Sequence, residues 1–257
     1  MCRHLAYLGR PVPLRALLVD PPHSLLRQSW APRRQRHGTV NADGFGVGWY
    51  ADGDPIPARY RSDHPMWTDR SFADLARVVR SRAVLAAVRS ATGTMPLTAG
   101  AAAPFAAGRY LFSHNGVVPG WPGGLAAIAS GLSPVALLRT MSEEAATDSA
   151  LLWVLTQQRL DGGAGLADAL AGVVRLAAST AGGRLNLLAT DGGQIAATAY
   201  GDTLAWRADD RGVLVASEPF DDDPGWVDVP DRSLLQATPD GVTVAPLPLD
   251  IPPELHR

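Results

Sequence analysis

Cys2 follows Met1 and is the only cysteine among the 257 residues of the chain. We expect removal of Met1, because the residue after it is small, and this removal would leave a free α-amine beside the thiol. An α-amine has a pKa of about 7.7–8 and a thiol one of about 8.5, so near neutral pH the amine can accept the thiol proton. Cys2 would then supply both the nucleophile and the base that acyl transfer requires.

Two other interpretations of Cys2 stay open. A cysteine at position 2 can be a small, buried apolar residue without a chemical role, and taken alone this interpretation is the simpler one. A thiolate could also pair with His4, because residues two positions apart on a strand point in the same direction. The single cysteine excludes an internal disulfide and a zinc site made of four thiolates.

Asn115 and Gly116 belong to a polar segment, Ser113-His114-Asn115-Gly116, that follows an apolar strand pattern. A strand that ends in Asn-Gly is, taken alone, a turn. For acyl transfer, however, the side-chain N–H of Asn115 and the backbone N–H of Gly116 are the donors that an oxyanion hole requires. Glycine also lets a substrate come close to the backbone. The segment is therefore a candidate oxyanion hole.

Two further segments could hold the charged groups of an amino acid. Arg89 ends a buried strand pattern, and its guanidinium can bind a carboxylate through two hydrogen bonds, with the hydroxyl of Thr92 nearby. Asp148 begins a helix pattern, and its carboxylate could pair with an ammonium group. Both residues also have structural interpretations, an arginine that extends to solvent and an acid that caps a helix. Together they would hold a glutamyl group whose γ-carbonyl is attacked by Cys2.

These motifs resemble the class II glutamine amidotransferases, a branch of the N-terminal-nucleophile (Ntn) hydrolases, and they occur in that family's order. The resemblance rests on Met1-Cys2, on Arg89-Ser90-Ala91-Thr92, on His114-Asn115-Gly116, on Asp148 between threonine and serine, and on the segment 41–46. It implies that Cys2 is the nucleophile with its α-amine as base, and that Asn115 and Gly116 form the oxyanion hole. It also implies that Arg89 and Thr92 bind the α-carboxylate of the substrate and that Asp148 binds its α-amine. Many glutamine-using relatives carry an acidic residue where this chain has Ala150, which indicates a separate branch.

Segments from MCRHLAYLG to SEPFDDDPGW extend the resemblance to nearly the full length. They are similar to a branch that removes glutamate from the γ-glutamyl conjugate of hercynylcysteine sulfoxide in ergothioneine biosynthesis. The resemblance implies a hydrolase with a small-molecule γ-glutamyl substrate and without a metal or organic cofactor. Two alternatives remain, a stand-alone glutaminase subunit that supplies ammonia to a separate synthase and a non-catalytic protein that binds γ-glutamyl ligands. A relative of the penicillin and bile-acid amidases would leave Arg89 and the His-Asn-Gly segment unexplained.

The elements that must position these residues alternate between strands and helices. Strand patterns cover 44–50, 83–88 and 109–114, and two hairpins cover 185–200 and 203–217; helix patterns cover 14–19, 23–30, 71–80, 148–160 and 166–178, with another beginning at 133. Strand groups separated by helical pairs predict an α+β fold with antiparallel sheets covered by helices. The resemblance implies a four-layer αββα sandwich. We expect one domain over 1–257, with a proline-rich tail from about residue 240 on the surface.

Composition narrows the choice of partners. With 23 basic and 25 acidic residues the net charge is −2, which gives no electrostatic reason to expect nucleic acid or an anionic membrane. The chain lacks an apolar run long enough for a membrane helix and begins without the pattern of a secretory signal, so we expect a cytoplasmic protein. The six histidines lack the spacing of zinc ligands. The sequence does not indicate whether the chain forms an oligomer.

Overall fold

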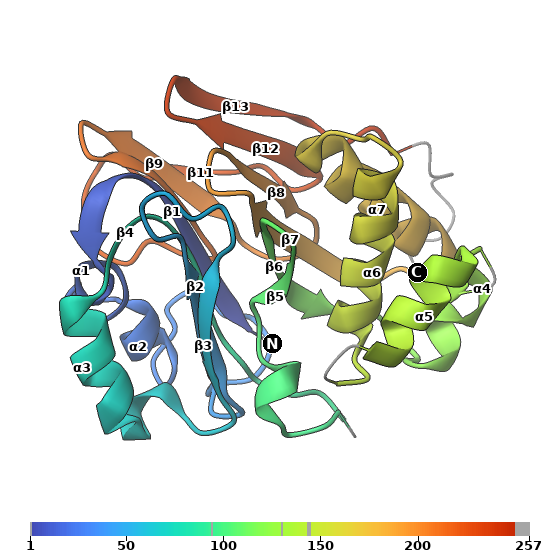
Figure 1. Cartoon of the computed structure of the whole chain (residues 1–257), viewed down its shortest axis with the longest axis horizontal. Helices are drawn as coiled ribbons and strands as arrows, with labels where there is room; N and C mark the ends of the chain where they lie inside the picture. The colour runs from blue at the N-terminus through green and yellow to red at the C-terminus, as the bar shows by residue number, and fades with distance from the viewer. Residues whose placement is uncertain (1, 94, 130, 143–144, 250–257) are drawn as a thin grey trace.

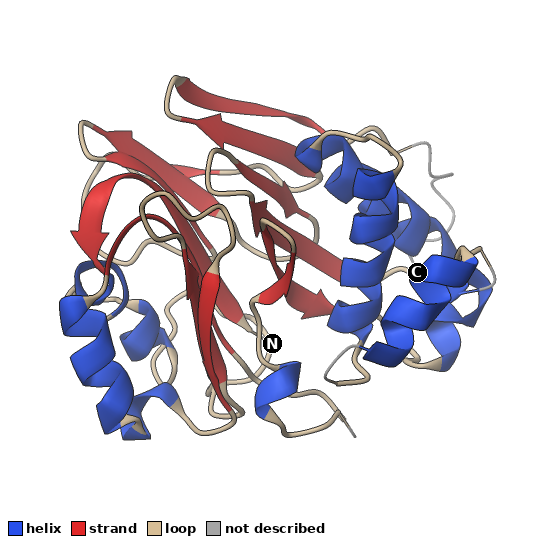
Figure 2. Ribbon diagram, viewed as in Figure 1, coloured by secondary structure: helices blue, strands red, loops and turns tan. Residues whose placement is uncertain are grey.

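The computed structural model describes residues 2–93, 95–129, 131–142 and 145–249. The predicted removal of Met1 therefore lies outside the described residues. Two antiparallel sheets lie face to face, and helices cover the outer face of each sheet (Figures 1 and 2). This arrangement confirms the predicted α+β fold and its four-layer αββα sandwich.

The first sheet, called sheet A, has the strand order β11-β9-β10-β1-β4-β2-β3. Its strands are β1 (Arg3–Pro13), β2 (Phe45–Trp49), β3 (Ala58–Ser62), β4 (Arg80–Val88), β9 (Ala205–Asp209), β10 (Gly212–Ala216) and β11 (Val227–Asp228). β1 lies in the middle and pairs with β4 on one side and with β10 on the other. The residue after the nucleophile candidate thus begins a central strand.

The second sheet, called sheet B, has the order β13-β12-β8-β7-β6-β5. Its strands are β5 (Phe105–Ala107), β6 (Tyr110–Val117), β7 (Arg184–Thr190), β8 (Ile195–Ala199), β12 (Ser233–Thr238) and β13 (Gly241–Pro246). β6 carries the candidate oxyanion hole and pairs with β7, with Asn115 opposite Asn186. The nucleophile and the oxyanion candidates therefore come from different sheets.

The first three α-helices lie outside sheet A, and the last four lie on the outer side of sheet B (Figure 1). They are α1 (Leu14–Leu18), α2 (Leu25–Gln28) and α3 (Arg70–Val78), then α4 (Ala126–Ala129), α5 (Pro134–Ser142), α6 (Asp148–Asp161) and α7 (Leu166–Thr180); single 3-10 turns cover Met66–Thr68, Ala99–Ala101 and Gly123–Leu125. The helix predicted over 71–80 begins at Arg70, after its cap Asp69, whose side chain accepts a hydrogen bond from Phe72 N. No described helix combines the length and the apolar character needed to cross a bilayer.

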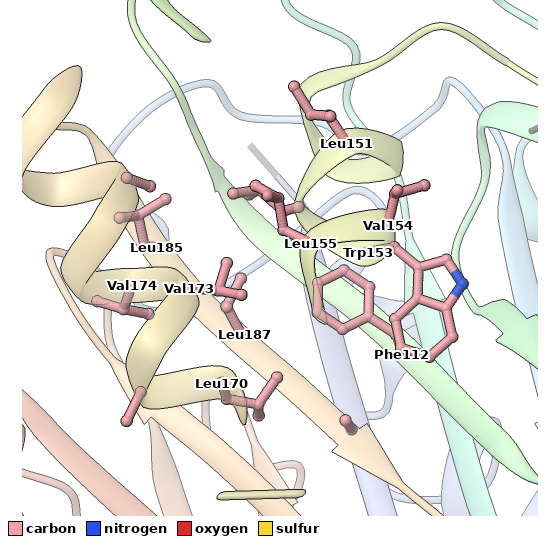
Figure 3. Packing of buried hydrophobic residues seen from close by; sticks show 14 of the residues in the cluster. Phe112, Leu151, Trp153, Val154, Leu155, Leu170, Val173, Val174, Leu185 and Leu187 are labelled. Atoms are coloured by element: carbon pink, nitrogen blue, oxygen red, sulfur yellow. The ribbon is translucent and has the colours of Figure 1, made fainter. Parts of the chain in front are cut away.

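A buried apolar cluster fixes α6 against sheet B, and Figure 3 shows it from close by. The rings of Trp153 on α6 and Phe112 on β6 stack with their centroids 5.2 Å apart, and Leu170 and Val173 of α7 belong to the same cluster. Such close packing holds an element in one position. The helix that begins at Asp148 is therefore placed rigidly beside the strand that carries Asn115 and Gly116.

The C-terminal part departs from the prediction. The segment from about residue 240 was expected as a proline-rich tail, but Gly241–Pro246 form the edge strand β13, paired with β12. The β-branched residues Val242, Thr243 and Val244 favour a strand, and the proline stands only at its end. Most of β13 remains exposed. Residues 250–257 lie outside the described part of the chain, and the single domain stays a prediction.

Candidate active site

One cleft brings together most of the predicted site residues. It encloses about 330 Å³ of space, part of it open to solvent, and is lined by Cys2, Arg89, Ser90, Ala91, Thr92, Met95, Ala101, His114, Gly116, Thr147, Asp148 and Ser149. Cys2 comes from the start of β1, Arg89 from the end of β4, Gly116 from β6 and Asp148 from the first turn of α6. The residues thus converge from both sheets and from a covering helix.

Cys2 lies at the cleft because of strand pairing. Arg3 is opposite Val88 in the β1–β4 pair, which places Cys2 beside the segment that follows β4. The sulfur of Cys2 is 3.9 Å from the carbonyl oxygen of Ser90. The residue is half-buried and lines the cleft, which disfavours its interpretation as a buried apolar residue.

His4 is a poor partner for the Cys2 thiolate. Its side chain is completely buried, and its Nδ1 lies 3.1 Å from Ser113 Oγ on sheet B. Burial, reinforced by the positive charge of Arg3, lowers the pKa of His4 to about 3. The ring is therefore neutral near pH 7 and lacks the positive charge that would stabilise a thiolate.

Arg3 contacts the candidate nucleophile directly, although nothing in the sequence marked it as a site residue. Its Nε donates a hydrogen bond to the carbonyl oxygen of Cys2 at 2.8 Å, and its Nη1 lies 3.7 Å from Glu218 Oε2. Both side chains are buried, and the Glu218 carboxylate also accepts the backbone N–H groups of Arg33 and Arg34, each at 2.8 Å. A buried ion pair is tolerated when such hydrogen bonds satisfy it. The pair thus holds the backbone of Cys2 in place through the hydrogen bond from Arg3 Nε.

Arg89 lies in the cleft wall and is held there by Asp43. Asp43 N donates to the carbonyl oxygen of Arg89 at 3.0 Å, Arg89 Nη1 donates to the carbonyl oxygen of Asp43 at 3.3 Å, and Asp43 Oδ2 accepts from Ala91 N at 2.7 Å. Arg89 is buried, yet within the described residues no carboxylate forms an ion pair with it. A buried cation of this kind favours an anionic ligand. Thr92 is exposed at the rim of the same cleft.

Gly116 and Asn115 occupy different positions relative to the cleft. Gly116 lines it, and a Cβ there would collide with the carbonyl oxygen of Arg184 and with the ring of His114. Asn115 is completely buried beside the cleft, and its Nδ2 donates to Ser217 Oγ over 3.4 Å. An amide nitrogen carries two hydrogens, so one remains for another acceptor. Their role as oxyanion donors stays a prediction.

Asp148 is held by backbone donors at the start of α6. Its Oδ2 accepts from Val118 N at 3.0 Å, and its Oδ1 accepts from Ser149 N at 2.7 Å. Thr147 caps the helix by accepting from Ala150 N at 3.0 Å. An ionised carboxylate has about four acceptor sites, so Asp148 can also accept hydrogen bonds from a ligand. The structural and the functional interpretation of Asp148 are thus compatible.

No group of three or more His, Cys, Asp or Glu side chains placed to hold a metal ion occurs in the ranges that the structure describes. The predicted independence from cofactors stays a prediction.

The chain is similar to known proteins in both sequence and structure. The family model described as "Glutamine amidotransferases class-II" matches residues 18–207. A γ-glutamyl-hercynylcysteine sulfoxide hydrolase from Mycolicibacterium smegmatis is 46% identical over 248 residues, which cover 96% of this chain and 100% of that protein. A protein of the same name from Mycobacterium tuberculosis is also 46% identical, over 96% of this chain and 97% of its own length. A solved class II glutamine aminotransferase domain protein from Silicibacter pomeroyi is 25% identical, with a TM-score of 0.65, over 96% of this chain and 99% of its own.

Proposed function

Because the chain belongs to the class II glutamine amidotransferase family, we propose that it hydrolyses a γ-glutamyl amide bond with Cys2 as the nucleophile. The substrate that we propose is γ-glutamyl-hercynylcysteine sulfoxide, an intermediate of ergothioneine biosynthesis. The observation that carries the reaction type is the convergence of Cys2, Arg89, Gly116 and Asp148 in one cleft. The 46% identity to the M. smegmatis hydrolase over its full length supports the choice of substrate.

The charged side chains orient the glutamyl group. The guanidinium of Arg89, which has no carboxylate partner among the described residues, binds the α-carboxylate together with the hydroxyl of Thr92. Asp148 binds the α-ammonium. A glutamyl group held by both charged groups of its α-carbon extends its γ-carbonyl, at the other end, toward Cys2. Fixing a reacting group in this way accounts for a large part of the rate enhancement in many enzymes.

Bond cleavage then follows in two steps. The α-amine of Cys2, free once Met1 is removed, accepts the thiol proton, and the thiolate attacks the γ-carbonyl carbon. The resulting oxyanion accepts hydrogen bonds from Gly116 N and Asn115 Nδ2, and its collapse expels the amine of the leaving group, which takes the proton from the α-ammonium of Cys2. Water, deprotonated by the same amine, hydrolyses the γ-glutamyl thioester and releases glutamate.

Replacing Arg89 by alanine should raise KM for γ-glutamyl substrates about 100-fold or more, because two charge-assisted hydrogen bonds to the α-carboxylate are lost. The variant should also lose its preference for γ-glutamyl amides over 4-aminobutyryl amides, which lack that carboxylate. Steady-state kinetics with both substrates measure the effect. Arg77→Ala on the exposed face of α3 is the matched control, since its side chain is 59% exposed and remote from the cleft. Unchanged kinetics in Arg89→Ala would rule out its part in the clamp.

Product analysis with a panel of γ-glutamyl amides tests the function itself. We expect glutamate and hercynylcysteine sulfoxide from the conjugate, at a higher kcat/KM than ammonia from glutamine. A preference for glutamine would indicate the glutaminase subunit instead. Binding of the conjugate without any cleavage, by protein whose intact mass shows that Met1 is absent, would indicate a binding protein.

A further inference from the structure

Ser149 lines the cleft next to Asp148 but has no part in the predicted clamp. It is the second residue of α6, and it is half-buried. Its hydroxyl oxygen lies 3.0 Å from Nδ1 of His114, a second cleft residue without a predicted role. The hydrogen bonds of these two side chains determine whether the Ser149 hydroxyl presents a hydrogen-bond donor or an acceptor to a ligand.

The ring of His114 is fixed by a backbone carbonyl. Its Nε2 lies 2.9 Å from the carbonyl oxygen of Arg184, and a carbonyl oxygen can only accept. Nε2 therefore carries the proton, and Nδ1 of the neutral ring presents a lone pair. The hydroxyl of Ser149 can then donate its single proton to this lone pair on Nδ1.

The alternative acceptor for that proton also lies inside the protein. Asp148 Oδ1 is 3.3 Å from Ser149 Oγ and can only accept while it is ionised. With either partner the hydroxyl proton points inward. The oxygen of Ser149 is then left with lone pairs for the cleft, which match a hydrogen-bond donor and not an acceptor.

The α-ammonium of a glutamyl group carries three donors, and Asp148 has limited capacity for them. Both of its oxygens already accept backbone N–H groups, from Val118 and from Ser149 itself. An ammonium ion that leaves water is stable only when its donors are satisfied. A second acceptor beside Asp148 meets this requirement.

We propose that Ser149 Oγ binds the substrate α-ammonium together with Asp148, and that His114 orients the Ser149 hydroxyl for this contact. This inference rests on the proposed function, since it assigns a further binding group to the same γ-glutamyl substrate. Ser149 then contributes to selectivity for a free α-amine, while Arg89 selects the carboxylate. His114 is a positioning residue that acts through Ser149.

The test compares γ-glutamyl-p-nitroanilide with glutaryl-p-nitroanilide, which differs only by lacking the α-amine. We expect Ser149→Ala to lower kcat/KM for the γ-glutamyl anilide about 10- to 100-fold, mainly through KM, and to leave the glutaryl anilide within twofold of the wild type. Affinities measured by calorimetry in a Cys2→Ala background should show the same selective loss, which covers the case of a very slow glutaryl substrate. Ser149→Thr keeps the hydroxyl and should restore the γ-glutamyl rate to within a few-fold.

Ser133→Ala is the matched control, because Ser133 also stands at a helix start, where its Oγ accepts from Ala136 N, but does not line the cleft. Equal losses with both anilides in Ser149→Ala would show a merely structural role and overturn the inference. Wild-type rates with both anilides would also overturn it. In both cases cleavage by the wild type leaves the proposed function intact. A wild-type enzyme that cleaves no γ-glutamyl amide at all would refute the proposed function, and this inference with it.

Discussion

Cys2→Ala should reduce hydrolysis of γ-glutamyl amides to background, a loss on the order of a million-fold where the chemical step limits the rate. The thiol is the group in the scheme that forms the covalent intermediate, so the variant lacks its nucleophile. Binding should persist, because the clamp of Arg89 and Asp148 is unchanged. Steady-state kinetics give the first quantity, and calorimetric titration of the variant with the uncleaved substrate gives the second.

Chemical labelling provides an independent test of the catalytic role of Cys2. The chain contains one cysteine, so iodoacetamide modifies only Cys2 and needs no background mutations. Inactivation should follow the extent of labelling, and saturating γ-glutamyl substrate should slow both. Retained activity in Cys2→Ala, or full activity after complete labelling, would remove the central hypothesis.

A single residue left ahead of Cys2 should lower kcat about 100- to 10,000-fold, the contribution typical of a general base. Such an extension turns the α-amine into an amide, which cannot accept the thiol proton, while the thiol itself is unchanged. The extended protein should therefore still react with iodoacetamide, at high pH in particular. Kinetics of a protein with an uncleaved N-terminal residue measure the loss, and mass spectrometry defines each N-terminus.

Two controls make this result specific. An extra residue added at the C-terminus instead should leave kcat unchanged. Proteolytic removal of the N-terminal extension directly before Cys2 should restore the rate. A normal rate in the extended protein would show that another group is the base. His4 is a weak candidate for that role, given its burial and its pKa of about 3.

Five of the six site residues predicted from the sequence line the cleft, and the sixth, Asn115, is buried beside it. Cys2, Arg89, Gly116 and Asp148 each stand at or near the boundary of an element whose hydrophobic pattern is strong, and their order matches one family. The pattern of the buried strand before Arg89 and that of the helix after Asp148 both correspond to elements of the structure, β4 and α6. Recognition of the family's motifs thus indicated which residues lie close together in space, which local hydrophobic patterns alone cannot show.

The supporting contacts could not be predicted, because they depend on long-range pairing. Arg3 would be expected at the surface, since charged residues are rarely buried without a partner, and its partner Glu218 is 215 positions away in the numbering. Asp43 binds the Arg89 turn from a separate loop. His114 and Ser149 come together only when α6 packs on β6.

The central strand β1 was missed for a related reason. Its first six residues, from Arg3 to Leu8, are all buried, because sheet B and the helices cover both faces of sheet A. A strand covered on both sides lacks the alternation that marks a half-exposed strand. The polar residues Arg3 and His4 further interrupt its apolar run.

The position of β1 between β4 and β10 also constrains how the protein matures on the ribosome. His4 N donates to Ser217 Oγ across 213 positions, so at about 5–20 residues per second the nascent strand waits about 10–40 s for this partner. During that interval the edge of β1 that will pair with β10 has no partner strand. Once β10 pairs with β1, the side chain of Arg3 is completely buried. We therefore expect Met1 to be removed from the growing polypeptide, before β1 pairs with β10.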